Sequence, residues 1–278
     1  MTYTQLSQQI QSKRTFLCIG LDPDRTLLPP HLTHHPQALF LFNKEIIDAT
    51  APYTVAYKPN TAFYEAEGAN GWAQLTQTLH YIRTHYPSTF IIADAKRGDI
   101  GNTAQRYAKA FFEALDVDAV TVAPYMGLDS ISPFLKYKNK WTIVLALTSN
   151  DTASDFELSP LANGKPLYEA VIEKCSQQGA KEQLMFVVGA TRPQKLAEIR
   201  KIVPHHFLLV PGVGAQGGSV AEVAKYGMND HCGLLVNVSR DIIYAGNDTN
   251  FAQAAGNRAA EIAKEMSRLL LATQTTPQ

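Results

Sequence analysis

The stretch FIIADAKRGDIGNTAQRYAKAFFEALDVDAVTVAP (90–124) holds one strand–helix–strand unit of the fold. Its ends, FIIADAK (90–96) and AVTVAP (119–124), are short, nearly continuous apolar runs, as expected for parallel strands that are covered on both faces. The segment between them, 103–115, has the spacing of an amphipathic helix, with four apolar residues on one side: Ala104, Ala108, Phe111 and Leu115. The stretch therefore predicts two parallel strands connected by a helix.

The same alternation of apolar runs and helical patterns continues along the chain. Runs rich in β-branched and aromatic residues occupy eight segments: 16–22, 54–59, 90–96, 119–124, 142–148, 184–190, 207–212 and 233–239. A helical pattern at 71–87 stops at Pro87, and 250–274 supplies a long final helix. Eight alternations over about 250 residues are typical of a TIM (β/α)₈ barrel, although an open doubly wound sheet fits the same periodicity. We predict an α/β fold with a single barrel domain over 1–278.

Two segments are longer than an ordinary turn between a strand and a helix. Residues 22–37 and 149–166 are rich in Pro, Asp, Ser or Thr, and both are predicted to be loops. Neither has the composition of a linker between domains, and the chain shows no internal repeat.

The amino-acid composition argues against several classes of binding partner for this protein. The 25 basic and 25 acidic side chains cancel, so no overall field would draw the protein to nucleic acid or to an anionic membrane. Three widely separated cysteines without CxxC spacing argue against a disulfide framework and a zinc site. The polar first residues do not resemble a signal peptide, and no apolar run reaches the roughly 20 residues that cross a bilayer. We expect a soluble cytoplasmic protein that binds small molecules and has no nucleic-acid or membrane partner.

Charged residues end several of the predicted strands, where a TIM barrel carries its chemistry. Asp94 and Lys96 are two residues apart in one strand, so their side chains leave the same face. Asp99 follows in the next turn, and Lys58 ends the neighbouring strand. An isolated Asp–Lys pair is usually only a structural ion pair. Two lysines and two aspartates in one small space are costly to desolvate for stability alone, which favours a functional site.

A phosphate site is indicated after the last two strands. PGVGAQGG (211–218) follows the seventh strand, and its glycines allow backbone amides to approach an anion closely. Arg240 follows the eighth strand and can bind phosphate in a bidentate manner. The loops after strands seven and eight are a recurrent phosphate site in TIM barrels, so we favour a phosphate ligand over a purely structural glycine loop.

The segment ADAKRGDIGNT (93–103) resembles the D-x-K-x-x-D-I-x-x-T signature of the orotidine 5′-phosphate decarboxylases, in the DAKRGDIG form of the longer bacterial branch. Five further segments look like that family in its order: GLDPD (20–24), YKPNTAF (57–63), LTSN (147–150), PGVGAQGG (211–218) and VSR (238–240). The resemblance implies conversion of orotidine 5′-phosphate (OMP) to UMP and CO₂, the last step of de novo UMP biosynthesis, without a metal or other cofactor.

The resemblance also implies a role for individual residues. Lys58, Asp94, Lys96 and Asp99 would form the catalytic charged array, with Asp99 and Thr103 reaching the partner's site in a homodimer. The residues that would bind substrate are Asp22 at the ribose, Ser149 at the pyrimidine, and Gln216 and Arg240 at the phosphate. The KPN after the second strand and the two long loops differ from shorter members of the family, which leaves open the role of Asn60 and the residue that contacts the pyrimidine.

The implied reaction makes clear demands on the site. Loss of CO₂ from C6 leaves electrons in an orbital that the ring cannot delocalise, so a fixed charge such as the Lys96 ammonium must stabilise them and supply the proton. Repulsion between Asp94 and the substrate carboxylate is a second, weaker candidate effect. Two alternatives remain: a Mg²⁺-dependent sister barrel, such as a 3-keto-gulonate 6-phosphate decarboxylase or a hexulose 6-phosphate synthase, and a non-catalytic nucleotide-binding barrel. The sister enzymes are expected to have an acidic residue where this chain has Lys58.

Overall fold

The strands close into a barrel in the computed structural model, which describes residues 1–214 and 217–275. All neighbouring strands are parallel, in the order β1 to β8, and β8 pairs with β1 through Cys18 and Asn237. The strands are Leu17–Gly20 (β1), Ala56–Lys58 (β2), Phe90–Arg97 (β3), Ala119–Val122 (β4), Trp141–Leu147 (β5), Leu184–Val188 (β6), Phe207–Pro211 (β7) and Leu234–Val238 (β8). The pairing of the first strand with the last confirms the (β/α)₈ barrel and rejects the open sheet.

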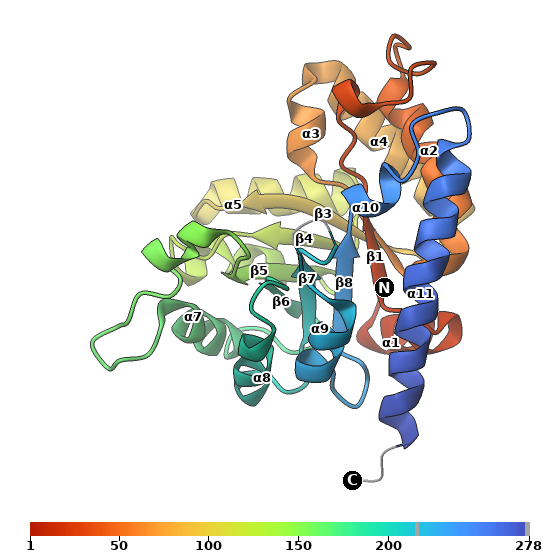
Figure 1. The fold of residues 1–278 in the computed structure, drawn as a ribbon. Coiled ribbons are helices and arrows are strands. Elements are labelled where there is room, and N and C mark those ends of the chain that lie inside the picture. Colours follow the sequence, from red (N-terminus) through yellow and green to blue (C-terminus); the bar gives the residue numbers. More distant parts are fainter. Residues whose placement is uncertain (215–216, 276–278) are drawn as a thin grey trace.

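Helices surround the barrel, and Figure 1 shows α11 running along its outer side next to β1 and α2. The α-helices are Tyr3–Lys13 (α1), Ala38–Thr50 (α2), Thr61–Glu65 (α3), Gly68–His85 (α4), Gly101–Lys109 (α5), Ser132–Leu135 (α6), Leu167–Ser176 (α7), Pro193–Ile202 (α8), Val220–Gly227 (α9), Arg240–Ile243 (α10) and Phe251–Thr275 (α11). Short helical turns lie at Arg25–Leu27 (η1), Ala51–Tyr53 (η2), Ala110–Ala114 (η3), Leu128–Ser130 (η4) and Asp151–Asp155 (η5). Within the described residues, none of the helices is both long and apolar enough to span a membrane.

The helices predicted at 71–87, 103–115 and 250–274 are all present, with small changes at their ends. The helix at 103–115 is divided, because α5 passes into the π-helical turn η3 at Ala110. The predicted loops 22–37 and 149–166 contain only the short turns η1 and η5. The spacing of apolar residues therefore located these helices correctly. The structure differs from the prediction only in where they begin and end and in the π-helical turn after α5.

Helix α1 closes the amino-terminal end of the barrel, and Figure 1 shows it at the opposite end of β1 from α10. Its first turn is held by a capping box, in which Thr2 Oγ1 accepts from the Gln5 N–H and Gln5 Oε1 accepts from the Thr2 N–H. The ring of Tyr3 packs against Trp141 and Phe207 at the starts of β5 and β7, with centroids 6.2 and 5.2 Å apart. The open end of the barrel is thus the carboxyl end of the strands.

Candidate active site

A cavity of about 380 Å³ lies at the carboxyl ends of β1, β2, β3, β7 and β8. Its lining includes Asp22, Lys58, Asp94, Asn237 and Arg240. Strands β8, β1, β2 and β3 are consecutive neighbours in the closed barrel, so residues from both ends of the sequence meet here. This is the position at which TIM barrels carry their active sites.

A lysine–aspartate–lysine array forms the centre of the site. The Nζ atoms of Lys58 and Lys96 lie 2.9 and 2.6 Å from the two different oxygens of Asp94. Lys58 and Asp94 are 4% and 9% exposed, whereas the Lys96 side chain is 48% exposed and can therefore meet a ligand. The array consists of a buried ion pair that holds a third, accessible charge.

The environment keeps both buried groups ionised. Burial by itself raises the pKa of Asp94, but Lys58 and Lys96 lower it more, so it lies well below its ordinary value of 3.8. Burial by itself lowers the pKa of Lys58, but the charges of Asp94 and Asp22 and the hydrogen bond to Asp94 hold it above its ordinary value of 10.5. The two groups titrate as a coupled pair, and at neutral pH both are charged.

Asp94 and Lys96 meet through an irregular backbone. The pairing of β3 with β4 shifts register between Ala93 and Arg97, and Lys96 has a φ of +46°, in the left-handed region. Regular alternation of side chains, which the sequence suggested, therefore does not hold at Lys96. The contact between Asp94 and Lys96 is nevertheless made, because the bulge directs the Lys96 side chain back to the carboxylate.

Asp22 is held by two neighbours at the rim of the cavity. Ser239 Oγ donates to Asp22 Oδ2 at 2.8 Å, and the Asn60 N–H donates to Asp22 Oδ1 at 3.1 Å. Gly20 permits this approach, because a Cβ at that position would lie 2.6 Å from Ser239 Cβ. The carboxylate is thereby oriented before any ligand binds, with lone pairs left to accept bonds from ligand hydroxyl groups.

The loop after β7 and the start of α10 also line the cavity. Gly212 and Gly214 have positive φ angles of 95° and 79°, which permit the tight turn of this loop. Arg240 is exposed, lines the cavity, and has no side-chain partner within the described residues, so its guanidinium is available to an anion. Gln216, the other predicted phosphate-binding residue, lies outside the described residues.

Four predicted site residues of the described chain are not among those that line this cavity: Lys96, which is bonded to the lining residue Asp94, and Asp99, Thr103 and Ser149. The Asp99 carboxylate accepts a bond from the Ile100 N–H at 2.7 Å and forms no ion pair within the described part of the chain. Thr103 is exposed on α5, and Ser149 is partly exposed after β5. A single chain therefore places four predicted residues on the cavity and Lys96 against one of them, but not Asp99, Thr103 or Ser149: the four are Asp22, Lys58, Asp94 and Arg240.

Sequence reasoning missed three residues around the array. Asn237 and Tyr244 line the cavity, and the Thr121 hydroxyl donates to Asp94 Oδ1 at 3.0 Å. Asn237 and Thr121 are polar residues inside apolar strand runs, at 7% and 1% exposure. A polar residue within an apolar run could have indicated these positions, because a buried polar group needs a hydrogen-bond partner.

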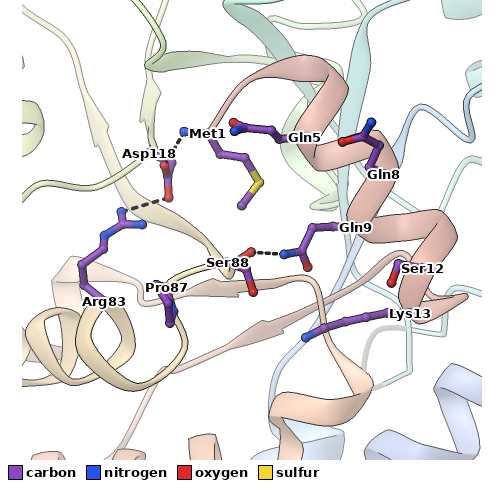
Figure 2. A pocket seen from close by; sticks show the side chains of 10 residues that line it. All are labelled: Met1, Gln5, Gln8, Gln9, Ser12, Lys13, Arg83, Pro87, Ser88 and Asp118. Carbon is purple, nitrogen blue, oxygen red and sulfur yellow. Dashed lines mark hydrogen bonds and ion pairs between the residues drawn. The ribbon is translucent and has the colours of Figure 1, made fainter.

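A larger cavity, of about 590 Å³, lies at the amino-terminal end, between α1 and the segments that lead into β3 and β4 (Figure 2). The charged groups around it have partners in the chain. Asp118 pairs with the Met1 amino group and with Arg83, at 2.7 and 3.0 Å, and Lys13 Nζ donates to the carbonyls of Ala51 and Thr54. Because these groups are satisfied and lie away from the strand carboxyl ends, the smaller cavity is the candidate active site.

A closed (β/α)₈ barrel with a charged array and an exposed arginine at the carboxyl ends of its strands has the architecture of a TIM-barrel enzyme. The sequence model of the "Orotidine 5′-phosphate decarboxylase / HUMPS family" matches residues 15–255. The chain belongs to this family.

Individual relatives agree with the family. A protein named orotidine 5′-phosphate decarboxylase from Phocaeicola vulgatus is 56% identical over 270 residues, which cover 97% of this chain and 99% of that protein. The protein of the same name from Bacteroides fragilis strain ATCC 25285 is 56% identical over 272 residues, 98% of this chain and 99% of that one.

Solved structures share the fold. The structure of Leishmania donovani UMP synthase has a TM-score of 0.85 and 36% identity, and the match covers 97% of this chain but 56% of that chain. A putative orotidine-monophosphate decarboxylase from Toxoplasma gondii has a TM-score of 0.84 and 35% identity, covering 96% of this chain and 98% of that one. The chain thus corresponds to almost the whole of the second protein and to about half of the first.

Proposed function

We propose that this chain is an orotidine 5′-phosphate decarboxylase that converts OMP to UMP and CO₂. The observation that carries this proposal is the Lys58–Asp94–Lys96 array at the carboxyl ends of β2 and β3. The relatives that are 56% identical over nearly the full chain have this name. Lys58 also favours this activity over that of the Mg²⁺-dependent sister barrels, in which an acidic residue is expected at that position.

Lys96 supplies the charge at the reacting carbon. When the C6–carboxylate bond breaks, its electron pair remains on C6 as CO₂ departs, and the ammonium stabilises this charge because it lies next to it. Lys96 then gives one proton to C6 to form UMP, and the resulting amine takes up a proton from solvent. The 48% exposure of its side chain makes Lys96 the member of the array that a substrate reaches.

Asp94 and Lys58 keep Lys96 in place and charged. Each oxygen of Asp94 bonds to one of the two lysines. The carboxylate therefore favours the charged form of both lysines when substrate excludes water. The carboxylate also faces the substrate carboxylate, and its repulsion is relieved as CO₂ leaves, as a second and smaller contribution.

The remaining residues bind parts of the substrate that do not react. Asp22, already oriented by Ser239, accepts bonds from the ribose hydroxyls together with Lys58 as donor. Arg240 and Gln216 bind the 5′-phosphate, and Ser149 contacts the pyrimidine edge. The phosphate lies far from C6, and its binding energy drives loop closure and the ordering of the charged array.

The active form is a homodimer in which Asp99 and Thr103 serve the partner's site. Asp99 has no ion pair with the array of its own chain within the described residues, and nearby segments carry exposed apolar side chains: Ile100, Tyr125 and Met126 are 47%, 85% and 52% exposed. The segments that carry them are neighbours, because the Ala123 N–H donates to the Arg97 carbonyl at 2.8 Å. A second copy would cover this apolar surface. We place the enzyme in the cytoplasm, at the last step of UMP biosynthesis.

The test is the decrease of OMP absorbance in buffer that contains EDTA. The wild-type protein is expected to turn over without added metal, and Lys96→Ala to lose at least about 100-fold in rate while UMP still binds. Lys174→Ala, which removes an exposed lysine on α7, is the matched control and should keep wild-type activity. A wild-type protein that binds UMP without turnover, or that turns over only with Mg²⁺, would contradict the proposal.

A further inference from the structure

Thr121 lies opposite the irregular part of β3. Ala93 pairs with Val120 and Arg97 pairs with Val122, so one residue of β4 faces the three residues 94–96 of β3. Thr121 is that residue, and it is 1% exposed. The two charged residues of the bulge, Asp94 and Lys96, are therefore held against a single side chain of the neighbouring strand.

The Thr121 hydroxyl is bonded to both of them. Thr121 Oγ1 accepts a bond from the Lys96 backbone N–H at 2.9 Å and donates one to Asp94 Oδ1 at 3.0 Å. An N–H group can only donate, so the hydroxyl proton is left for the carboxylate. Asp94 Oδ1 thus receives the Thr121 hydroxyl and the Lys96 ammonium, while Oδ2 receives Lys58.

The backbone of Lys96 needs such support. Its φ of +46° lies in a region that residues with a side chain seldom adopt, and the register shift leaves its N–H without a strand partner. The hydroxyl of Thr121 satisfies this part-buried N–H in place of a carbonyl. Without it, the N–H would have to find another acceptor, and the bulge would rearrange.

We propose that Thr121 is a positioning residue that aims the Lys96 ammonium, by holding both the backbone of Lys96 and the carboxylate to which its side chain is bonded. This inference rests on the proposed function, because the aim of Lys96 matters only if its ammonium acts at C6. Thr121 is 1% exposed and its hydroxyl is bonded to Lys96 and Asp94, so it acts through these two residues and not on the substrate.

The experiment compares two substitutions at Thr121 with one at Thr142. Thr121→Val keeps the branched shape and removes the hydroxyl, whereas Thr121→Ser keeps the hydroxyl. Thr142→Val on neighbouring β5 is the matched control: Thr142 is also 1% exposed, but its hydroxyl has no partner within the described residues. OMP turnover, its pH profile and urea unfolding are measured for each variant and for the wild type.

Thr121→Val is expected to lower kcat about 10- to 100-fold, the usual effect of losing a hydrogen bond to a charged group. KM should change little, because the ribose and phosphate contacts lie elsewhere. The acid limb of the kcat profile should move to higher pH, since Asp94 loses a donor that favours its charged form. Thr121→Ser should restore kcat and the profile, and Thr142→Val should match the wild type in both.

Several outcomes would overturn the inference while leaving the enzyme claim intact. Turnover by Thr121→Val at the wild-type rate with an unmoved acid limb is one, and equal loss in Thr121→Ser and Thr121→Val is another, since it would assign the effect to packing. If Thr121→Val does not fold, the pair Thr121→Ser and Thr121→Ala makes the same comparison, and equal rates would reject the role. A wild-type protein without turnover would instead reject the proposed function.

Discussion

At the scale of single residues, the site depends on a buried ion pair. Removing two charges from water is expensive, and Lys58 and Asp94 are tolerated at 4% and 9% exposure because each neutralises the other and Lys96 adds a third charge. Replacing such a pair with apolar residues often stabilises a protein, so the array represents a cost to the fold that its proposed role in catalysis would explain.

Asp94→Asn is expected to lower the free energy of unfolding by about 3–5 kcal/mol at pH 7, because it leaves Lys58 buried without a counter-charge. The loss should depend on pH in a defined direction. The pKa of Asp94 is lower in the folded than in the unfolded chain, so its stabilisation is complete above about pH 4 and declines as the pH falls further. The pKa of Lys58 is raised in the folded chain, so Lys58 affects stability at alkaline pH. Its stabilisation is complete below about pH 10 and is lost at higher pH.

Urea unfolding at several values between pH 7 and pH 3 measures this difference. Wild type and Asp94→Asn should differ by a constant amount from pH 7 to about pH 5 and converge below about pH 4. Asp151→Asn, which removes an exposed carboxylate, makes the same change in net charge and should follow the wild type. A constant difference down to pH 3 would mean that folding does not lower the pKa of Asp94.

At the scale of elements, β3 and α1 differ in their geometry and lie at opposite ends of the barrel. Strand β3 departs from regular geometry where it carries Asp94 and Lys96, and such irregularity is typical of strands next to active sites. Helix α1 is regular and capped, and it seals the other end of the barrel with Tyr3 over Trp141 and Phe207. The irregular part of β3 thus lies at the end that carries the charged array, and α1 contributes stability at the other end.

Two substitutions in the first turn of α1 are expected to have opposite signs. Thr2→Ala removes the side chain that caps the helix and should cost about 1 kcal/mol, or roughly 2–4 °C in Tm. Thr4→Ala changes the same residue type two positions later, at an exposed helical site, where alanine is the better helix former and stability should rise slightly. Thermal unfolding of both variants measures the two changes in Tm. Equal changes would show that the capping box does not contribute to stability.

At the scale of the whole molecule, closure of the barrel assembles the site. Ser239 bonds to Asp22 across 217 positions of sequence, because β8 returns to pair with β1. An open sheet would leave these strands at separate places and would separate Arg240 from the charged array. The apolar side chains Ile100, Tyr125 and Met126 remain exposed on this assembled surface, which is why we expect a second copy to cover them.

Mixing two inactive variants tests whether Asp99 acts in the partner's site. Lys96→Ala and Asp99→Ala should each be inactive alone. In a mixed dimer, the Asp99→Ala chain keeps its own Lys96 and receives Asp99 from the Lys96→Ala chain, so one of its two sites is complete. After random exchange of subunits, activity should return to about one quarter of the wild-type value.

The amount of dimer in the mixture is followed by sedimentation, so that failure to exchange is not mistaken for failure to complement. If Asp99 acted within its own chain, both sites of the mixed dimer would stay incomplete and no activity would return. The same result from a protein that remains monomeric would reject the homodimer itself.

The amino-acid sequence by itself determined the alternation of strands and helices and the residue types at the strand ends. These are local properties, because the spacing of apolar residues records which face of each element is buried. It also located Lys58, Asp94 and Lys96 at neighbouring strand ends, and Asp22 and Arg240 at the first and last strands. Their meeting at one cavity then followed from the barrel rule that strand ends converge.

Only the tertiary structure decided how these residues meet. The closure of β1 on β8, the bulge that turns Lys96 back to Asp94, and the bonds from Thr121 and Ser239 join residues that are distant in sequence. No local pattern encodes such contacts, because each depends on which strand becomes a neighbour and in what register. Three members of the predicted array, Lys58, Asp94 and Lys96, were therefore foreseeable from the sequence, whereas Asp99 does not join them within one chain. The geometry of the three arose from barrel closure and from the irregular part of β3.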